Sequence, residues 1–237
     1  MTLQLRIELR TDAAPGTGAG GPDVDRDVPC DDFGVPYLPG RRLKGLLREA
    51  CQEVIDALAL AGLGAWSEGH TCGVEELFGT PEQEGRVTVG DARLAGEAGD
   101  EGYDILARWL AWDASQEQRA ITPETILRHL TTVRTQTAID ARTGAALHGA
   151  LRSTRLVRRG LRFASPLALR GLRPDSEEST RRMLALAAGA LRHLGASRNR
   201  GAGVVRCQLW DDADLTAGAV AELDAYVAGL PGGRDRR

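Results

Sequence analysis

The sequence contains almost no lysine: of its 30 lysine and arginine residues, Lys44 is the only lysine. It also lacks any apolar run long enough to span a membrane, which argues against an integral membrane protein. The N-terminus does not show the basic-then-apolar order of a secretory signal peptide, and the four cysteines are scattered without a disulfide-framework pattern. These absences predict a cytoplasmic protein with reduced thiols and no membrane partner.

Charge is unevenly distributed along the chain. The net charge of −3 does not by itself suggest a nucleic-acid-binding protein. The segment from Arg134 to Arg173, however, contains nine arginines and a single acidic residue, Asp140. A genomic preference for arginine explains the shortage of lysine but not this local shortage of acids. Because binding responds to the local field, this segment is predicted to contact RNA or DNA.

The periodicity of apolar residues predicts alternating strands and helices. The expected strands are residues 3–10, 86–92, 156–163 and 204–210. The expected helices are residues 41–60, about 175–194, where Gly195 is expected to end the helix, and 214–229. This order is that of the split β-α-β plan. It predicts an α+β fold with a ferredoxin-like, or RRM-like, antiparallel sheet and two helices.

The chain of 237 residues is long enough for one good core. We expect a palm domain over residues 1–210, interrupted by a Gly/Asp-rich loop at 11–39 and an insertion at 95–155. Residues 211–237 are predicted to form a C-terminal helix and a loose tail.

The first predicted helix begins with unusual charges. A Pro39-Gly40 turn leads directly into Arg41, Arg42 and Lys44, and Arg48 follows one turn later. Positive charge at a helix N-terminus opposes the macrodipole and costs about 0.3–1 kcal/mol per charge. This arrangement is favourable where an anion binds, because free N–H groups and basic side chains then converge on it. The pattern predicts a phosphate site, with RNA as the ligand.

A second glycine-rich segment, Gly195–Gly203, links the second predicted helix to the last strand. Closely spaced glycines let a backbone approach phosphates, and Arg198 and Arg200 add positive charge. Helix-to-strand turns often carry glycine and arginine for structural reasons alone. The segment therefore becomes informative only together with the first helix.

Four segments, in this order, resemble landmarks of the RAMP superfamily of CRISPR-associated proteins. They are Gly34–Arg48, Leu77–Gly79 with Gly85–Ala92, Thr137–Gly144, and Gly195–Gly203. The first and last resemble superfamily-wide motifs. The third, with Thr137-Ala138-Ile139-Asp140, resembles a segment of the backbone subunits that coat the guide RNA in type III effector complexes. The resemblance covers about residues 1–210.

This resemblance implies a ferredoxin-like palm with a thumb hairpin that pries the guide–target duplex apart, and residues 134–160 are the thumb candidate. Such subunits stack head to tail along a CRISPR RNA in an antiviral ribonucleoprotein. The implied partners are guide RNA, target RNA, copies of the same chain and other type III effector subunits. The expected RNA contacts are Arg41, Arg42, Lys44, Arg48, Arg134, Arg152, Arg155, Arg198, Arg200, Gly201 and Gly203.

The acidic loop at residues 23–32 precedes the Pro39-Gly40 turn. In target-cleaving relatives an aspartate of this loop is essential for metal-dependent cutting, and the matching position is Asp25, with Asp23 the next candidate. A carboxylate can hold a hydrated Mg²⁺ or Mn²⁺ near the scissile phosphate, or help align the ribose 2′-hydroxyl. The resemblance thus implies an endoribonuclease with Asp25 as catalytic residue and metal ligand. Because short aspartate side chains also form turns, a structural role stays open for each aspartate of this loop.

Two other functions stay open. A RAMP subunit can be a non-catalytic structural or capping subunit, although five aspartates beside RNA favour the cleaving form. It can also be an endoribonuclease that processes the guide precursor, but such enzymes usually rely on histidine, and residues 11–48 contain none. Zinc is not expected, because only Cys72, with His70, precedes Leu77-Phe78-Gly79, where some relatives carry a cysteine pair.

Overall fold

The fold is built on an antiparallel sheet packed against a layer of helices. The computed structural model describes residues 3–16, 20–21, 23–64, 73–96, 101–118, 120–147, 149–196 and 200–230. Its main sheet is antiparallel, with the order β2-β6-β1-β7, and β3 also pairs with β6. The strands are β1 (Leu3–Leu9), β2 (Val87–Val89), β3 (Arg93–Leu94), β6 (Arg162–Leu169) and β7 (Val205–Trp210).

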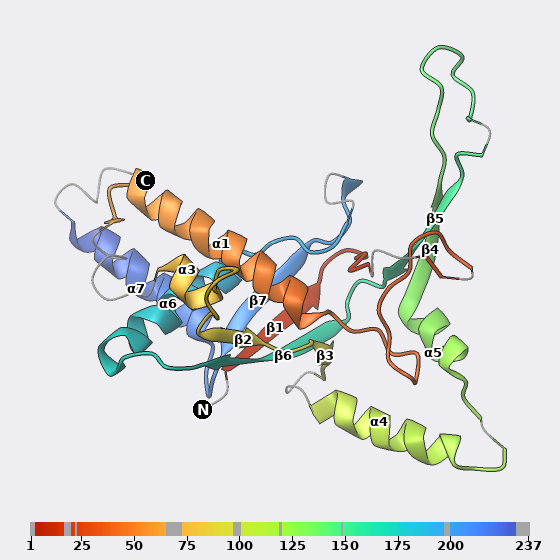
Figure 1. The fold of residues 1–237 in the computed structure, drawn as a ribbon, viewed down its shortest axis with the longest axis horizontal. Helices are drawn as coiled ribbons and strands as arrows, with labels where there is room; N and C mark the ends of the chain where they lie inside the picture. The colour runs from red at the N-terminus through yellow and green to blue at the C-terminus, as the bar shows by residue number, and fades with distance from the viewer. Residues whose placement is uncertain are drawn as a thin grey trace.

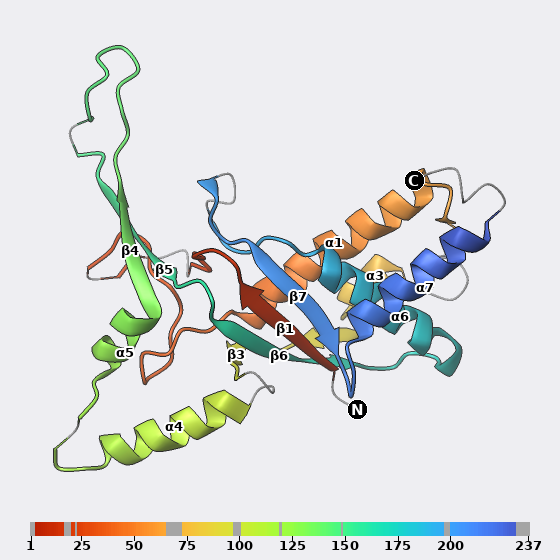
Figure 2. The same ribbon diagram turned by 180° about the vertical axis from the view of Figure 1, so that it is seen from behind.

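One face of the sheet is covered by helices, and the core lies between the two layers (Figure 1). In β1, every second residue from Leu3 to Leu9 is buried against the helices, as strict alternation requires. The helices on this side are α1 (Gly40–Leu60), the short α3 (Val74–Phe78), α6 (Pro174–Ala190) and α7 (Leu215–Gly229). The opposite face of β1 and β7 carries none of the described helices (Figure 2).

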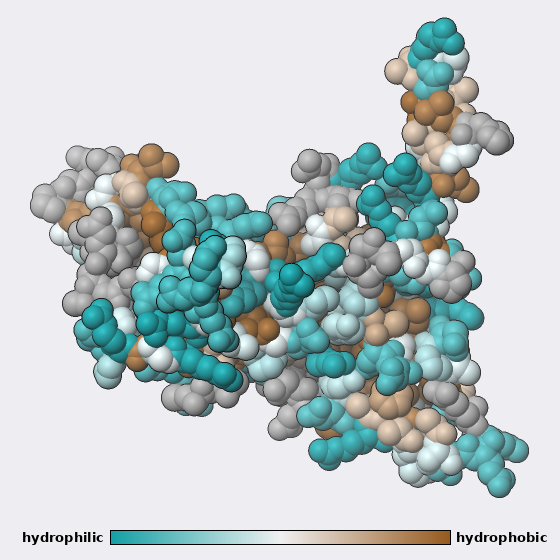
Figure 3. All heavy atoms as spheres, in the orientation of Figure 1, coloured by the Kyte–Doolittle hydropathy of each residue, from teal (hydrophilic) through white to brown (hydrophobic). Residues whose placement is uncertain are grey.

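The insertion between β3 and β6 forms a separate projection. It comprises α4 (Glu101–Ala114), α5 (Pro123–Leu130) and the hairpin of β4 (Thr131–Gln136) and β5 (Arg152–Val157). The hairpin extends away from the body of the molecule (Figure 1). Its outer part exposes Ile139, Leu147 and Leu151, and hydrophobic surface is visible along it in Figure 3. A hairpin with exposed apolar side chains is suited to a partner that buries them.

The predicted strand at 156–163 is wrong. β5 ends at Val157, the chain turns at Gly160, and β6 begins only at Arg162. Gly160 has a φ of +83°, a conformation that favours glycine, and its N–H donates to the Leu9 carbonyl at 2.7 Å. The alternation of apolar residues continued by chance across a turn that joins two different sheets.

The sequence pattern did not predict the rest of β6, because this strand contains a proline in its interior. Pro166 has no N–H, and it lies where β2 gives way to β3. The Ser165 hydroxyl donates to the Gly90 carbonyl at 2.7 Å at this interruption. The predicted strand at 86–92 is correspondingly too long: β2 ends at Val89, and β3 begins only at Arg93. A proline is tolerated in this strand because its missing donor faces a break in the ladder.

The second predicted helix is also shorter than expected. α6 ends at Ala190, so Gly195 does not terminate it. Gly195 instead has a φ of +80°, and a Cβ there would lie 2.3 Å from the Ala14 carbonyl oxygen. Glycine is therefore required at position 195, because the loop after β1 approaches the backbone there too closely for a side chain.

The α+β class with an antiparallel sheet is confirmed. The strand order is compatible with the ferredoxin-like plan, with α1 and α6 as its two helices. The division into a 1–210 palm and a C-terminal segment stays a prediction. Among the described helices, none has the length and apolar character needed to cross a membrane.

Candidate nucleic-acid interface

The start of α1 is held by the protein's own carboxylate. The Gly40 N–H donates to Asp91 Oδ1 at 2.8 Å, and the Arg42 N–H donates to the Pro39 carbonyl at 3.0 Å. Gly40 is buried, and a Cβ at this position would lie 2.4 Å from the Val89 carbonyl oxygen. The Pro-Gly turn is therefore explained by packing against β2. Asp91 supplies part of the negative charge that the sequence pattern had assigned to a bound anion.

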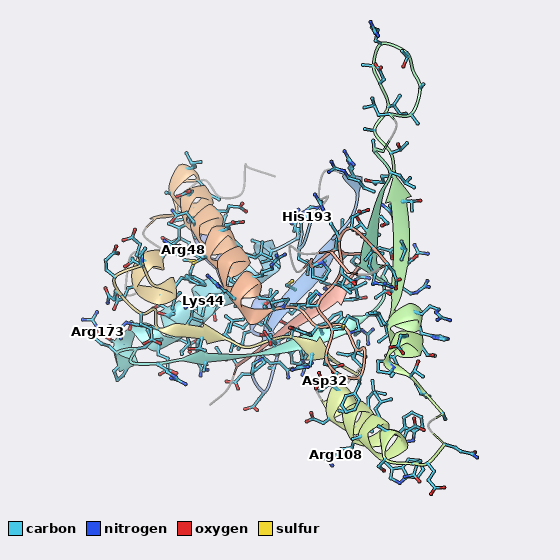
Figure 4. The ribbon with its side chains drawn as sticks, turned by 45° about the vertical axis from the view of Figure 1, so that its right-hand side comes forward. Asp32, Lys44, Arg48, Arg108, Arg173 and His193 are labelled. Carbon is cyan, nitrogen blue, oxygen red and sulfur yellow. The ribbon has the colours of Figure 1, made fainter. Side chains whose placement is uncertain are left out.

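The basic residues of α1 lie on two different flanks. Arg41, Lys44 and Arg48 follow helical spacing along one flank. Arg48 Nη1 donates to the Gly79 carbonyl beyond α3 at 3.1 Å, and Figure 4 shows Lys44 and Arg48 on the side of α1 away from the hairpin. Arg42 lies on the other flank, where its Nη1 donates to the Pro15 carbonyl at 2.6 Å. The cations that the sequence assigned to one phosphate site are therefore divided, with Arg42 on one flank of α1 and the other three on the opposite flank.

The Arg42 flank lies beside the beginning of the glycine-rich segment. A groove between them is lined by Pro15, Arg42, Glu49, Leu194 and Gly195, among others. The Ala196 N–H donates to the Ala14 carbonyl at 2.9 Å, which fixes the glycine-rich segment against the loop after β1. The fold therefore brings the first and last landmarks together. Arg198 lies outside the described residues.

A basic cleft opens at the base of the hairpin. It has a volume of about 530 Å³ and is lined by Thr11, Asp12, Thr132, Arg134, Arg158, Arg159 and Gly201. The only acid among them, Asp12, accepts a hydrogen bond from the Arg159 backbone N–H at 3.0 Å. Arg200 Nη1 donates to Gln136 Oε1 at 2.8 Å, which links the glycine-rich segment to β4. Two predicted RNA contacts, Arg134 and Gly201, therefore face one cleft.

Sequence reasoning did not single out Arg158 and Arg159. Both lie within the strand wrongly predicted at 156–163, where alternation would have placed them on opposite faces. In the structure they are exposed in the turn before Gly160 and line the same cleft. An arginine pair followed by glycine was the available signal for a turn.

The acidic loop runs along the hairpin, with Asp25 exposed on it. Asp25 Oδ2 accepts hydrogen bonds from the Ser153 N–H at 2.6 Å and the Ser153 hydroxyl at 3.0 Å. These donors, with a smaller effect of Arg152, lower the pKa of Asp25 below its usual value. Asp25 is therefore an accessible, ionised carboxylate beside the outer end of the paired strands β4 and β5. Asp23 is exposed on the same loop.

The other aspartates of this loop have different surroundings. Asp27 Oδ1 accepts from Arg155 Nε at 2.8 Å, so Arg155, a predicted RNA contact, forms an ion pair within the protein. Asp31 Oδ2 accepts from the Tyr103 hydroxyl at 2.5 Å and thereby joins the loop to α4. Burial, together with the bond to Asp31, raises the pKa of Tyr103 to about 12. Asp32 is exposed near α4 (Figure 4).

The donor set around Asp25 fits only a partly hydrated cation. Within the described ranges, no group of three or more His, Cys, Asp or Glu side chains could hold a metal ion. Mg²⁺ commonly binds through one or two carboxylates and completes its shell with water and substrate phosphates. Asp25, with Asp23 nearby in the chain, is compatible with such a site once RNA is bound.

The cysteines in the described part of the chain are core or loop thiols. Cys51 and Cys207 are buried, and burial raises the pKa of Cys51 to about 11 and that of Cys207 still further. Cys30 is exposed as a residue within the acidic loop, but its thiol is partly buried. This partial burial, with a smaller effect of the nearby Asp27 and Asp31 carboxylates, raises the pKa of the thiol. His70 and Cys72, the residues weighed for zinc, lie outside the described residues.

Comparisons with known proteins agree with this geometry. A model of the RAMP superfamily matches residues 6–206. No curated protein sequence matches significantly. A chain in "Cryo-EM structure of the Type III-B Cmr-beta bound to cognate target RNA" has a TM-score of 0.59 at 13% identity, covering 88% of this chain and 97% of that one. A chain in "Type III-B Cmr-beta Cryo-EM structure of the Apo state" has the same score and identity, covering 90% and 98%. At this identity the likeness shows a shared fold.

Proposed function

Because the chain belongs to the RAMP superfamily, we propose that it is a guide-RNA-binding backbone subunit of a type III CRISPR effector complex. In this role it binds guide RNA, copies of itself and other effector subunits, and it cleaves target RNA paired with the guide in antiviral defence. The shared fold with chains from type III-B Cmr-beta complexes supports this proposal, since one of those complexes is bound to cognate target RNA.

One observation carries the cleaving role: an accessible carboxylate is held on the paired strands of a projecting hairpin, and an arginine-lined cleft opens at the base of the same hairpin. Asp25 is bonded to Ser153, and Ser153 lies opposite Thr135 in the hairpin. Side chains alternate along a strand, so Arg134, which lines the cleft, lies on the other face of the hairpin from Ser153. RNA whose phosphates occupy this cleft would cross the paired strands to reach Asp25. Contacts of this kind are independent of sequence, as a subunit that coats any guide requires.

The chemistry needs little from the protein. The 2′-hydroxyl oxygen of the target attacks the adjacent phosphorus in line, the bond to the leaving 5′-oxygen breaks, and a cyclic phosphate remains. A bound Mg²⁺ or Mn²⁺ would neutralise charge on that phosphate. Asp25 would hold the cation or orient the 2′-hydroxyl. The exposed apolar side chains of the hairpin would separate the base pairs and splay the strand into the required geometry.

The test is cleavage of complementary RNA by the assembled complex. We expect cuts at a regular spacing, and we expect EDTA or Asp25→Asn to stop them while guide RNA stays bound. Asp32→Asn is the matched control, because Asp32 is an exposed aspartate of the same loop. Asp23→Asn identifies which of the two candidate carboxylates is essential. Undiminished cutting by the Asp25→Asn complex would overturn the catalytic role of Asp25, and undiminished cutting by the Asp23→Asn complex as well would favour a purely structural subunit.

A further inference from the structure

β5 is paired on both of its edges. On one side it pairs with β4 along its whole length, from Arg152 to Val157. On the other side the acidic loop runs parallel to it: the Arg26 N–H donates to the Ser153 carbonyl at 3.2 Å, and the Arg155 N–H donates to the Arg26 carbonyl at 2.9 Å. The loop is therefore joined to the free edge of β5 by an isolated parallel bridge at Arg26. Edge pairing of this kind fixes both position and register.

Side chains reinforce this pairing on either side of Arg26. Asp25 bonds to Ser153 through three contacts: two into Oδ2, and one from its own N–H to the Ser153 hydroxyl at 3.1 Å. Two residues further on, Asp27 pairs with Arg155, and their side chains are only 22% and 13% exposed. The Asp25–Ser153 and Asp27–Arg155 contacts are two residues apart in the loop and two residues apart in β5. The loop therefore cannot slide along β5 without breaking both contacts.

The contacts of Asp25 leave part of its carboxylate accessible. Both recorded hydrogen bonds to the side chain reach Oδ2. Oδ1 receives none from the residues that the structure describes, and the side chain is exposed. One oxygen thus anchors the group, while the exposed side chain leaves the carboxylate accessible to solvent. This is the arrangement that a reacting carboxylate requires, because small displacements are costly for catalysis.

We propose that Ser153 is a positioning residue that fixes Asp25 relative to the hairpin, so that the hairpin and the cleaving carboxylate approach the target RNA as one unit. This inference rests on the proposed function. It explains how cuts follow the positions where hairpins enter the duplex: the carboxylate moves with the hairpin and keeps a constant distance from its base.

The test uses two substitutions of one shape in the assembled complex. Ser153→Thr keeps the hydroxyl, and Ser153→Val replaces that hydroxyl with a methyl group, while both β-branched residues suit a strand. We expect Ser153→Val to lower the single-turnover cleavage rate about tenfold relative to Ser153→Thr, because hydrogen bonds to a charged group are among the stronger ones. Affinities for guide and target should be equal in the two variants. Thr154→Val is the control in the adjacent position of β5.

A second measurement reports on the anchor without activity. Amide hydrogen exchange of residues 23–28 in the complex should be faster in Ser153→Val than in Ser153→Thr. If Asp25→Asn is inactive but Ser153→Val cuts as fast as Ser153→Thr, the proposed function stands and the positioning role is overturned. If Asp25→Asn cuts at the wild-type rate, the proposed catalytic role of Asp25 fails, and the positioning role of Ser153 fails with it.

Discussion

Gly40 and Gly45 lie in the same helix but in opposite environments. A Cβ at Gly40 would meet the backbone of β2 at 2.4 Å, whereas a Cβ at Gly45 would have no heavy atom within 4 Å. Helical glycine is otherwise unfavourable, because it loses more backbone entropy on folding than alanine does. The two positions therefore separate a glycine required by packing from one that packing does not require.

We predict opposite effects of alanine at these two positions. Gly45→Ala should raise the free energy of unfolding by about 0.5–1 kcal/mol, the ordinary gain in helix propensity. Gly40→Ala should lower it by about 1–3 kcal/mol, since the added methyl group forces α1 away from β2. Urea unfolding followed by circular dichroism measures both. If Gly40→Ala raised the free energy of unfolding, the close contact with β2 would not be the reason for glycine at position 40.

At the residue scale, the sequence predicted candidate residues from local spacing, but it did not predict contacts between residues far apart in the chain. The exposed aspartate at position 25 could be proposed from its place upstream of the Pro-Gly turn. Its partner Ser153 could not be, because 128 positions separate them. The bond from the Gly40 N–H to Asp91, across 51 positions, could not be predicted for the same reason. Local spacing contains no information about which distant strand will supply a donor.

At the scale of elements, α1 presents a row of cations that ends in a structural contact. Arg41 and Lys44 come first, and Arg48 is already bonded to Gly79. Phosphate contacts release condensed counterions, so they appear in the dependence of affinity on salt. The first two cations of this flank are therefore the ones to test.

We expect the double variant Arg41→Ala/Lys44→Ala to weaken RNA binding by a similar factor for all sequences. The slope of log K against log salt should fall by about 0.7 for each single-strand phosphate contact that is lost. Arg108→Ala is the control, because Arg108 is an exposed arginine of α4, an element that carries none of the predicted RNA contacts (Figure 4). Filter binding across a salt series measures the slopes. An unaltered slope in the double variant would mean that these side chains are merely solvated.

Whole elements were predicted well where one period is continuous and poorly where a turn interrupts it. α1 begins at Gly40 and ends at Leu60, close to the predicted bounds, because its apolar stripe has no break. The strand predicted at 156–163 failed because alternation on both sides of Gly160 was in phase. The parallel pairing of the acidic loop with β5 could not be predicted, since it involves no periodic pattern at all.

For the whole molecule, the structure separates a compact body from a projecting hairpin. Every residue of 137–151 that the structure describes is exposed or half-buried, and none belongs to the core. Gln136 and Arg152 face each other at the end of the paired strands. Residues 137–151 can therefore be replaced by Asn-Gly, a two-residue turn suited to closing a hairpin. Ser153, the Arg200–Gln136 contact and the basic cleft are all retained in this variant.

This truncation tests whether separation of the duplex and cleavage are distinct functions of one chain. The free energy of unfolding should change by less than about 0.5 kcal/mol, since only exposed residues are removed. Guide RNA should still bind, because Arg134, Arg158 and Arg159 remain in the cleft. Target cleavage should fall steeply, because the side chains that part the base pairs are gone while Asp25 stays in place. Cleavage at the full rate would show that a carboxylate anchored on the paired strands is sufficient, and that the outer hairpin serves contacts between subunits instead.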